Sequence, residues 1–198
     1  MRLFVDCASP SQIEDWVRHP WVSGFTTNPT LMRKQGGAGD NAILWAKEAV
    51  KAARGKPISI DGPESVTALG ENVYRKVIDY QGDLRRQLNH TAICTSEQLR
   101  DLTINLDNII SVFAGRIMDT GRDPQPVIDA AKATGAQVLW ASVREPYNIV
   151  QAEKAGCDIV TVSPAILQKY LDWNGKPLEV VAKETIAQFA KDSEDLQW

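Results

Sequence analysis

Residues 108–142 read NIISVFAGRIMDTGRDPQPVIDAAKATGAQVLWAS, and this stretch decides the fold class. Its two apolar runs, residues 108–113 and 137–142, are short and rich in β-branched and large apolar residues, as buried strands are. Between them, Asp123-Pro124 begins a helical pattern that ends at Gly135. A strand, a helix and a second strand in this order predict parallel strands joined by a crossover helix.

The same alternation runs through the whole chain. Eight strand-like runs bounded by turn residues are expected; they are residues 3–6, 24–27, 57–61, 72–78, 91–94, 108–113, 137–142 and 158–163. Eight alternating units predict an α/β protein with one domain over residues 1–198, a compact parallel (β/α)8 TIM barrel. A doubly wound open sheet is the alternative, although no GxGxxG motif follows the first run.

Helices are expected between these runs where capping residues occur. They cover residues 12–18, 41–54, a segment from Ser96 to Leu106, the pattern ending at Gly135, residues 165–171 and a C-terminal helix at about 178–191. Two connections are short, with ten residues at 62–71 and twelve at 79–90. A parallel crossover needs about a dozen residues or more, so the helices beside the fourth strand, near 64–69 and 82–88, are predicted to be shortened.

Composition excludes several classes of protein. The chain has 198 residues and a net charge of −3, with 22 basic and 25 acidic residues interspersed, which is unlike a nucleic-acid-binding surface. No apolar run approaches the roughly 18 residues of a membrane span. The start, MRLFVDCASP, lacks the features of a signal peptide. Three widely spaced cysteines and two distant histidines predict free thiols in the cytoplasm and no metal site.

Lys76 is the most informative residue, because active sites of such barrels form at the C-terminal ends of the strands. Alternation in residues 72–78, NVYRKVI, places Tyr74 and Lys76 on one face and Arg75 on the other. One of the two charges must therefore point inward, which is costly for a charge without a role. Burial lowers the pKa of an amine and frees its lone pair to attack a carbonyl. The alternative is an edge strand with both charges in water.

Two strand-end carboxylates offer acid and base chemistry. Asp6 ends the first strand and Asp61 the third, so both are expected at the same end of the barrel. Schiff-base chemistry needs such groups to move protons and activate water. Each aspartate could instead be a helix cap or a turn residue.

Three residues after the sixth and seventh strands suit a phosphate group. Arg116 and Arg144 offer multidentate guanidinium groups, and Ser142 adds a hydroxyl donor. The alternative is that either arginine pairs with a surface acid such as Asp119 or Glu145.

Five motifs, taken together, resemble the transaldolase family and occur in that family's order. They are GFTTNPTLM at 24–32, NVYRKV at 72–77, NHTAI at 89–93, SVFAGRI at 111–117 and ASVR at 141–144. The resemblance runs from Leu3 to about Leu171 and is greatest to the short bacterial transaldolases and fructose-6-phosphate aldolases. It implies phosphorylated sugar substrates and a homo-oligomer such as a ring pentamer or decamer.

The resemblance also implies a role for each site residue. Lys76 forms the imine with a ketose, Asp6 is the acid and base beside the bond that breaks, and Asp61 and Thr91 hold the water. The substrate-binding set is Thr27, Asn28, Asn89, Ser111, Phe113, Arg116, Ser142 and Arg144. No metal or organic cofactor is needed, because the protonated imine is the electron sink.

The expected function is that of a class I transaldolase of the pentose phosphate pathway, which transfers a dihydroxyacetone unit between sugar phosphates. A fructose-6-phosphate aldolase-type lyase and a catalytically silent sugar-phosphate-binding homologue are the alternatives. Phe113 favours transaldolase, because the aldolases carry Tyr there. Asp61 stands where transaldolases carry Glu and aldolases Gln, so its carboxylate is one methylene short. The shortened helices are expected to leave apolar strand faces uncovered unless another subunit packs on them.

Overall fold

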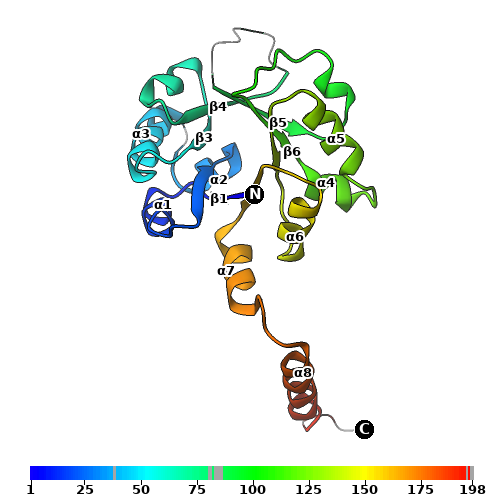
Figure 1. Ribbon diagram of the computed structural model, residues 1–198. Coiled ribbons are helices and arrows are strands. Elements are labelled where there is room, and N and C mark those ends of the chain that lie inside the picture. The colour runs from blue at the N-terminus through cyan, green and yellow to red at the C-terminus, as the bar shows by residue number, and fades with distance from the viewer. Residues whose placement is uncertain (38, 80–81, 83–86, 195, 197–198) are drawn as a thin grey trace.

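Eight parallel strands form a closed barrel in the computed structural model, which describes residues 1–37, 39–79, 82, 87–194 and 196. Each strand pairs with the next, and β8 closes the barrel on β1 (Figure 1). The strands are β1 (Arg2–Asp6), β2 (Val22–Thr26), β3 (Ile58–Asp61), β4 (Val73–Val77), β5 (Leu88–Ile93), β6 (Ile109–Val112), β7 (Gln137–Trp140) and β8 (Ile159–Val162). The predicted (β/α)8 TIM barrel is therefore confirmed, and the open sheet is wrong.

Most of the expected helices are present, with ends within a few residues of the predicted ones. The α-helices are α1 (Pro10–Trp16), α2 (Pro29–Lys34), α3 (Ala42–Ala52), α4 (Ala114–Asp119), α5 (Gln125–Ala133), α6 (Tyr147–Lys154), α7 (Pro164–Trp173) and α8 (Leu178–Ser193). Sequence analysis did not predict α2, α4 and α6. They have six, six and eight residues, which is too short to display a clear helical period.

The predicted helix from Ser96 to Leu106 is wrong. The structure has only the 3-10 helix η3 (Glu97–Leu99) there, and the Ser96 side chain makes no capping hydrogen bond. The Asn108 side-chain oxygen accepts from the backbone N–H of Asn105 at 3.2 Å, and the Asn105 side chain accepts from Asp107 N–H at 2.8 Å. Such local side-chain bonds compete with the helical backbone ladder.

The connections beside β4 are short, as expected. The 3-10 helix η2 (Glu64–Leu69) joins β3 to β4. The helix expected near 82–88 falls largely outside the described residues, and its last residue, Leu88, begins β5. The apolar strand faces are nevertheless covered by the chain itself, because Val73, Val77, Leu88 and His90 are all buried. The expectation of uncovered faces was therefore wrong.

The core has two layers. The larger layer lies between the barrel and its helices, and a smaller one fills the barrel interior with Phe4, Ile109, Leu139, Ala141 and Ile159. A Cβ atom at Gly24 would lie 2.6 Å from the Phe4 ring, so only glycine leaves room for this ring to fill the interior. Phe4 thereby forms an apolar floor two residues below Asp6.

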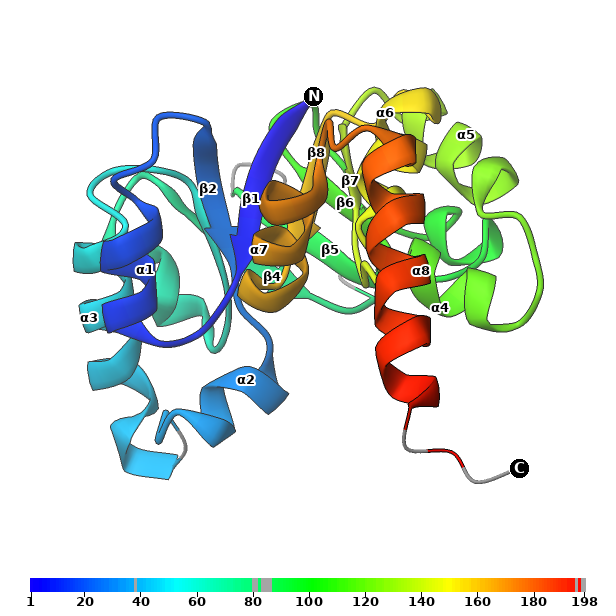
Figure 2. The same ribbon diagram turned by 90° about the horizontal axis from the view of Figure 1, so that it is seen from below.

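The last two helices differ in their packing. Figure 2 shows α7 beside β1 and β8, and Leu167 of this helix is buried. Figure 1 shows α8 apart from the strands. None of the residues of α8 is buried. Among the described residues, no helix is long and apolar enough to cross a membrane.

The cysteines are unpaired, as expected from their spacing. Cys7, Cys94 and Cys157 are all free thiols. Burial raises the pKa of Cys7 and of Cys157 to about 12, so both thiols are inert at neutral pH.

Candidate active site

The side chain of Lys76 points into the barrel, on the face that alternation predicts for Tyr74 as well. Tyr74 packs on the interior apolar layer, while Arg75 on the opposite face donates its Nε to the Gly62 carbonyl at 3.1 Å. Strand pairing places Lys76 opposite Asp61 of β3 and Asn89 of β5. The interior cation is therefore the lysine, and its side chain is only 7% exposed.

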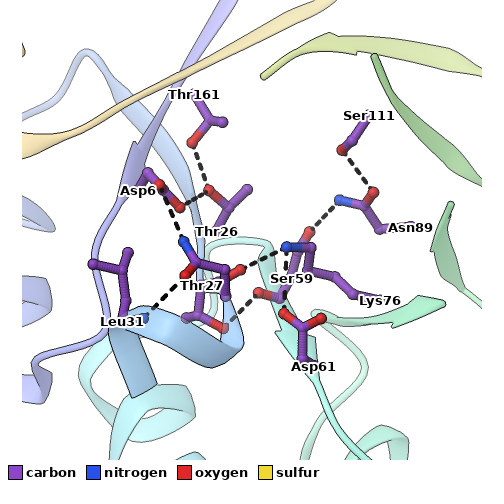
Figure 3. Close-up of polar contacts among 11 residues, drawn as sticks. Asp6, Thr26, Thr27, Leu31, Ser59, Asp61, Lys76, Asn89, Ser111 and Thr161 are labelled. Carbon is purple, nitrogen blue, oxygen red and sulfur yellow. Dashed lines mark hydrogen bonds and ion pairs between the residues drawn. The ribbon is translucent and has the colours of Figure 1, made fainter. Parts of the chain in front are cut away.

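Two oxygen atoms hold the Lys76 ammonium group. Nζ donates to the Thr27 carbonyl at 2.7 Å and lies 3.3 Å from Asp61 Oδ2 (Figure 3). The Asp61 contact is an ion pair by distance, and no hydrogen bond to its buried Oδ2 is present within the described residues. Burial raises the pKa of Asp61, and the neighbouring Lys76 partly offsets that rise. The Lys76 amine and the Asp61 carboxyl therefore face each other directly inside the barrel.

Asp6 faces the same space from β1. Its Oδ1 accepts from the Thr26 hydroxyl at 2.8 Å, and its Oδ2 lies 3.5 Å from the Asn28 side-chain nitrogen. The Asn28 Oδ1 also accepts from Leu31 N–H at 3.0 Å and so caps α2. Burial raises the pKa of Asp6, and the Thr26 hydrogen bond is the largest opposing influence. Asn28 thus caps the start of α2 and also contacts Oδ2 of Asp6.

A buried chain of hydrogen bonds fixes the Asn89 amide. Its Nδ2 donates to Ser59 Oγ at 2.9 Å, and its Oδ1 accepts from Ser111 Oγ at 2.7 Å. Ser59, Asn89 and Ser111 are each at most 2% exposed. Because both ends of the amide are engaged, its orientation is set before any ligand arrives.

Thr91 lies two residues beyond Asn89 on β5. Its hydroxyl is buried and has no hydrogen-bond partner among the described residues. The strand is irregular at this point, since the register shifts between His90 and Ile93 and Ala92 has a φ of 61°. This buried hydroxyl lies on β5, the strand that pairs with β4, which carries Lys76, and it can accept a hydrogen bond from a small polar molecule or donate one to it.

The two expected phosphate-binding arginines lie exposed beyond β6 and β7. The Arg116 guanidinium carbon is 5.0 Å from the centre of the half-buried Phe113 ring. Arg144 Nη2 lies 2.7 Å from Asp119 Oδ2, with about half of each side chain exposed. The alternative considered for Arg144, a surface ion pair with Asp119, is therefore present.

A close backbone contact links the start of α4 to the segment that follows β7. A Cβ atom at Gly115 would lie 1.7 Å from the Ser142 carbonyl oxygen and 3.3 Å from Arg144 Cγ. Ser142 has a φ of 63°, which turns the chain sharply after β7. The start of α4 and the segment after β7 are thus in direct contact, which brings Ser142 and Arg144 beside the helix that carries Arg116.

Sequence analysis missed three residues that contact the predicted ones: Thr26, Ser59 and Thr161. All three are buried and face the barrel interior from β2, β3 and β8. Alternation supplied a usable signal for Ser59, which lies two residues before Asp61 and so on the same face of its strand. No three acidic, histidine or cysteine side chains in the described part of the chain are placed to hold a metal ion.

Comparison with known proteins identifies the family. The sequence model of the family described as "Transaldolase/Fructose-6-phosphate aldolase" matches residues 85–197. A protein named "Probable transaldolase" from Thermoplasma volcanium is 30% identical, over 85% of this chain and 86% of its own length. This chain belongs to the transaldolase/fructose-6-phosphate aldolase family. Another "Probable transaldolase" of the family, from Nitrosopumilus maritimus, is 28% identical and covers 100% of this chain and 96% of its own length.

The two kinds of match cover different parts of the chain. The match to the family model begins at residue 85, beyond Lys76. The Nitrosopumilus maritimus protein aligns over the whole chain, including β1 to β4, and its alignment spans 220 positions against 198 residues here. That relative therefore carries residues that this family member lacks.

Proposed function

We propose that this protein is a class I transaldolase, which moves a dihydroxyacetone unit from a ketose phosphate to an aldose phosphate through a Schiff base on Lys76. The observation that carries the proposal is the position of Lys76 Nζ. It lies inside the barrel, 2.7 Å from the Thr27 carbonyl and 3.3 Å from a carboxylate whose pKa is raised by burial. An enclosed amine with a proton acceptor beside it suits nucleophilic attack on a carbonyl.

The first half of the reaction forms the imine. Asp61 takes a proton from the Lys76 ammonium group, and the neutral amine then attacks the ketose carbonyl carbon. A carbon–nitrogen bond forms, and the carbonyl oxygen leaves as water after gaining two protons. The buried Oδ2 of Asp61 and the buried hydroxyl of Thr91 both lack a hydrogen-bond partner among the described residues, which suits them to hold that water.

The second half breaks and remakes a carbon–carbon bond. Asp6 removes the proton from the hydroxyl next to the bond, the bond breaks, and its electrons move into the protonated imine to give an enamine. The aldehyde product leaves, and the enamine attacks the acceptor aldehyde while Asp6 returns the proton. Water held by Asp61 and Thr91 then hydrolyses the new imine, which releases the ketose phosphate and restores the Lys76 amine. Asn28, Asn89 and Ser111 would bind the dihydroxyacetone hydroxyls, with Thr27 and Phe113 beside them. Phe113 offers no hydroxyl, which favours transfer over simple cleavage.

The substrate phosphate would bind at Arg116, Ser142 and Arg144. The contact of Gly115 with Ser142 supports this proposal, because it holds the three residues on adjoining segments. Arg144 is partly neutralised by Asp119, so an incoming phosphate must compete with a carboxylate for part of the guanidinium group.

We place the protein in the cytoplasm on the basis of its free thiols. We also propose that it forms a homo-oligomer, such as a ring pentamer or decamer. The proposed contact is α8, which has no buried residue and exposes Leu178, Ile186 and Phe189 by 68–79% (Figure 1). A second copy of the chain is the expected occupant of this apolar face. Sedimentation of wild type and of Ile186→Glu/Phe189→Glu tests it: the double variant should be smaller, and equal sizes would contradict the contact.

Acceptor-dependent kinetics test the reaction. With fructose 6-phosphate alone, little free dihydroxyacetone should appear, and adding an aldose phosphate should start ketose transfer. Lys76→Met should abolish transfer without unfolding the protein. Equal release of dihydroxyacetone with and without acceptor would instead indicate an aldolase-type lyase. Binding of sugar phosphate without any turnover would indicate a catalytically silent homologue.

A further inference from the structure

Two buried threonines from different strands form a chain of hydroxyl groups that ends on Asp6. Thr161 Oγ1 of β8 lies 2.6 Å from Thr26 Oγ1 of β2, and Thr26 Oγ1 lies 2.8 Å from Asp6 Oδ1 (Figure 3). Thr161 and Thr26 are 6% and 3% exposed. Nothing in the reaction proposed above uses Thr161, although it contacts the residue that binds Asp6.

Counting hydrogens gives this chain of hydroxyl groups a direction. The Thr26 hydroxyl carries one hydrogen, and a carboxylate can only accept, so that hydrogen points to Asp6. Thr26 must then accept in its contact with Thr161, which makes Thr161 the donor. Hydrogen bonds aligned in one direction polarise and strengthen one another. Both hydroxyl dipoles therefore point toward Asp6 Oδ1.

The barrel backbone fixes these three side chains in place. Strand pairing sets Asp6 opposite Thr26, and it sets Phe4 opposite Thr161. Phe4 is fully buried beneath Asp6 against Gly24. The barrel therefore sets the backbone positions of both threonines beside Asp6, and only a side-chain rotation can take either hydroxyl out of the series of hydrogen bonds.

We propose that Thr161 is a positioning residue for the carbon–carbon bond step: it holds the Thr26 hydroxyl on Oδ1 of Asp6 and leaves Oδ2 to exchange the proton with substrate. The inference rests on the proposed function, in which Asp6 is the acid and base. It assigns the two carboxylate oxygens different tasks. Oδ1 is anchored by Thr26, whereas Oδ2 has only the longer 3.5 Å contact with Asn28.

Two charged groups face Asp6 besides this chain. Lys76 of β4 favours the ionised carboxylate, and Asp61 of β3 opposes it. Burial raises the pKa of Asp6, and the Thr26 hydrogen bond lowers it more than Lys76 or Asn28 does. Removing the Thr161 hydroxyl leaves those charges in place and frees Thr26 to turn away, so the Asp6 carboxylate should become harder to ionise.

The test compares Thr161→Val with Thr161→Ser, since valine matches the shape of threonine without the hydroxyl and serine retains it. The midpoint of Asp6 ionisation is followed by ¹³C NMR of the carboxyl carbon, assigned with Asp6→Asn. We expect valine to raise the midpoint by roughly half to one pH unit, and serine to restore it. In turnover, valine should lower kcat several-fold, leave KM nearly unchanged and move the acidic limb of the pH profile upward.

A matched control separates this effect from general loss of packing. Thr134 ends α5 and its hydroxyl donates to the Ala131 carbonyl at 2.7 Å, away from Asp6. Thr134→Val should leave the Asp6 midpoint unchanged even if stability falls. If Thr161→Val does not fold, Thr161→Cys, with a weaker donor, should shift the midpoint in the same direction.

An unshifted midpoint in folded Thr161→Val, or a serine variant that behaves like valine, would overturn the inference. The NMR titration needs no turnover, so it judges the hydroxyl chain even if the protein fails to form an imine. Failure of imine formation would count against the proposed function alone.

Discussion

Gly115→Ala should damage phosphate binding through a backbone clash. The added Cβ would lie 1.7 Å from the Ser142 carbonyl oxygen, whereas real Cβ atoms essentially never approach another atom within 3.0 Å. The two backbone segments must therefore separate by about 1.3 Å, because a carbonyl oxygen cannot rotate away as a flexible side chain can. Overpacking of this kind costs about 1–3 kcal/mol, and each kcal/mol lowers the Tm of a protein this size by about 2–4 °C.

The functional consequence should be larger than the loss of stability. Ser142 and Arg144 move away from the helix that carries Arg116, and a misplacement of about 1 Å can cost on the order of 100-fold in rate. We expect KM for fructose 6-phosphate to rise at least about ten-fold. Trapping of unphosphorylated dihydroxyacetone on Lys76 should change little, because Lys76 lies on β4.

Gly121→Ala is the matched control for this substitution. Gly121 has a φ of 75° and nothing within 4 Å of its Cβ position, so alanine there costs about 1 kcal/mol of backbone strain without a clash. Both variants should lose stability, but only Gly115→Ala should raise KM. Wild-type KM in Gly115→Ala would refute the argument that this contact holds the phosphate site together.

Three further predictions concern single charged groups. Asp119→Asn should lower the Kd of inorganic phosphate by up to about five-fold in calorimetry, because the half-exposed ion pair with Arg144 is worth about 0.2–1 kcal/mol. Weaker binding would mean that Asp119 instead orients Arg144. Asp6→Asn should raise Tm at pH 7. Burial raises the pKa of Asp6 in the folded protein, so Asp6 ionises in the unfolded chain at a lower pH than in the folded one. Its ionisation therefore lowers the free energy of unfolding at pH 7, and asparagine removes that cost. That gain should shrink as pH falls toward 4, and a constant gain would contradict it. His90→Gln should reduce the fall in the free energy of unfolding as pH drops below about 6.5. Burial lowers the pKa of His90 in the folded protein, so the unfolded chain takes up the proton first. If denaturant titrations show the same fall in the variant, His90 is not its cause.

The barrel was predictable because each strand has a local signal in the sequence. Short apolar runs ending in turn residues set all eight strands, and the C-terminal ends of parallel strands bring Asp6, Asn28, Asp61 and Lys76 to one end of the barrel. Alternation showed that Arg75 and Lys76 lie on opposite faces, and the chemistry of an amine nucleophile favoured Lys76 as the inward residue. These inferences succeeded because they depend on a period of two residues and on strand order, both visible in the sequence.

The helix predictions that failed concern segments without a clear local signal. The segment from Ser96 to Leu106 has a capping serine, but the side chains of Asn105 and Asn108 bind the backbone and prevent a helix. Helices α2, α4 and α6 have six, six and eight residues and are too short to show a period. Tertiary context decides such segments, so the sequence alone leaves them open.

The partners of the site residues were the least predictable part. Thr161 and Thr26 come from strands on either side of Asp6, and only the closure of β8 on β1 brings them together. Arg144 had two possible partners, phosphate and Asp119, which chemistry alone does not separate. The structure places it on Asp119, with half of its side chain still exposed.

Borohydride trapping with fructose 6-phosphate tests the central claim most directly. The protein is incubated with the sugar and reductant, digested and mapped by mass spectrometry, with Lys76→Ala as the control. The account predicts a stable adduct confined to the peptide that carries Lys76, and none in the control. A folded wild-type protein that forms no adduct, or forms one on another lysine, would contradict it.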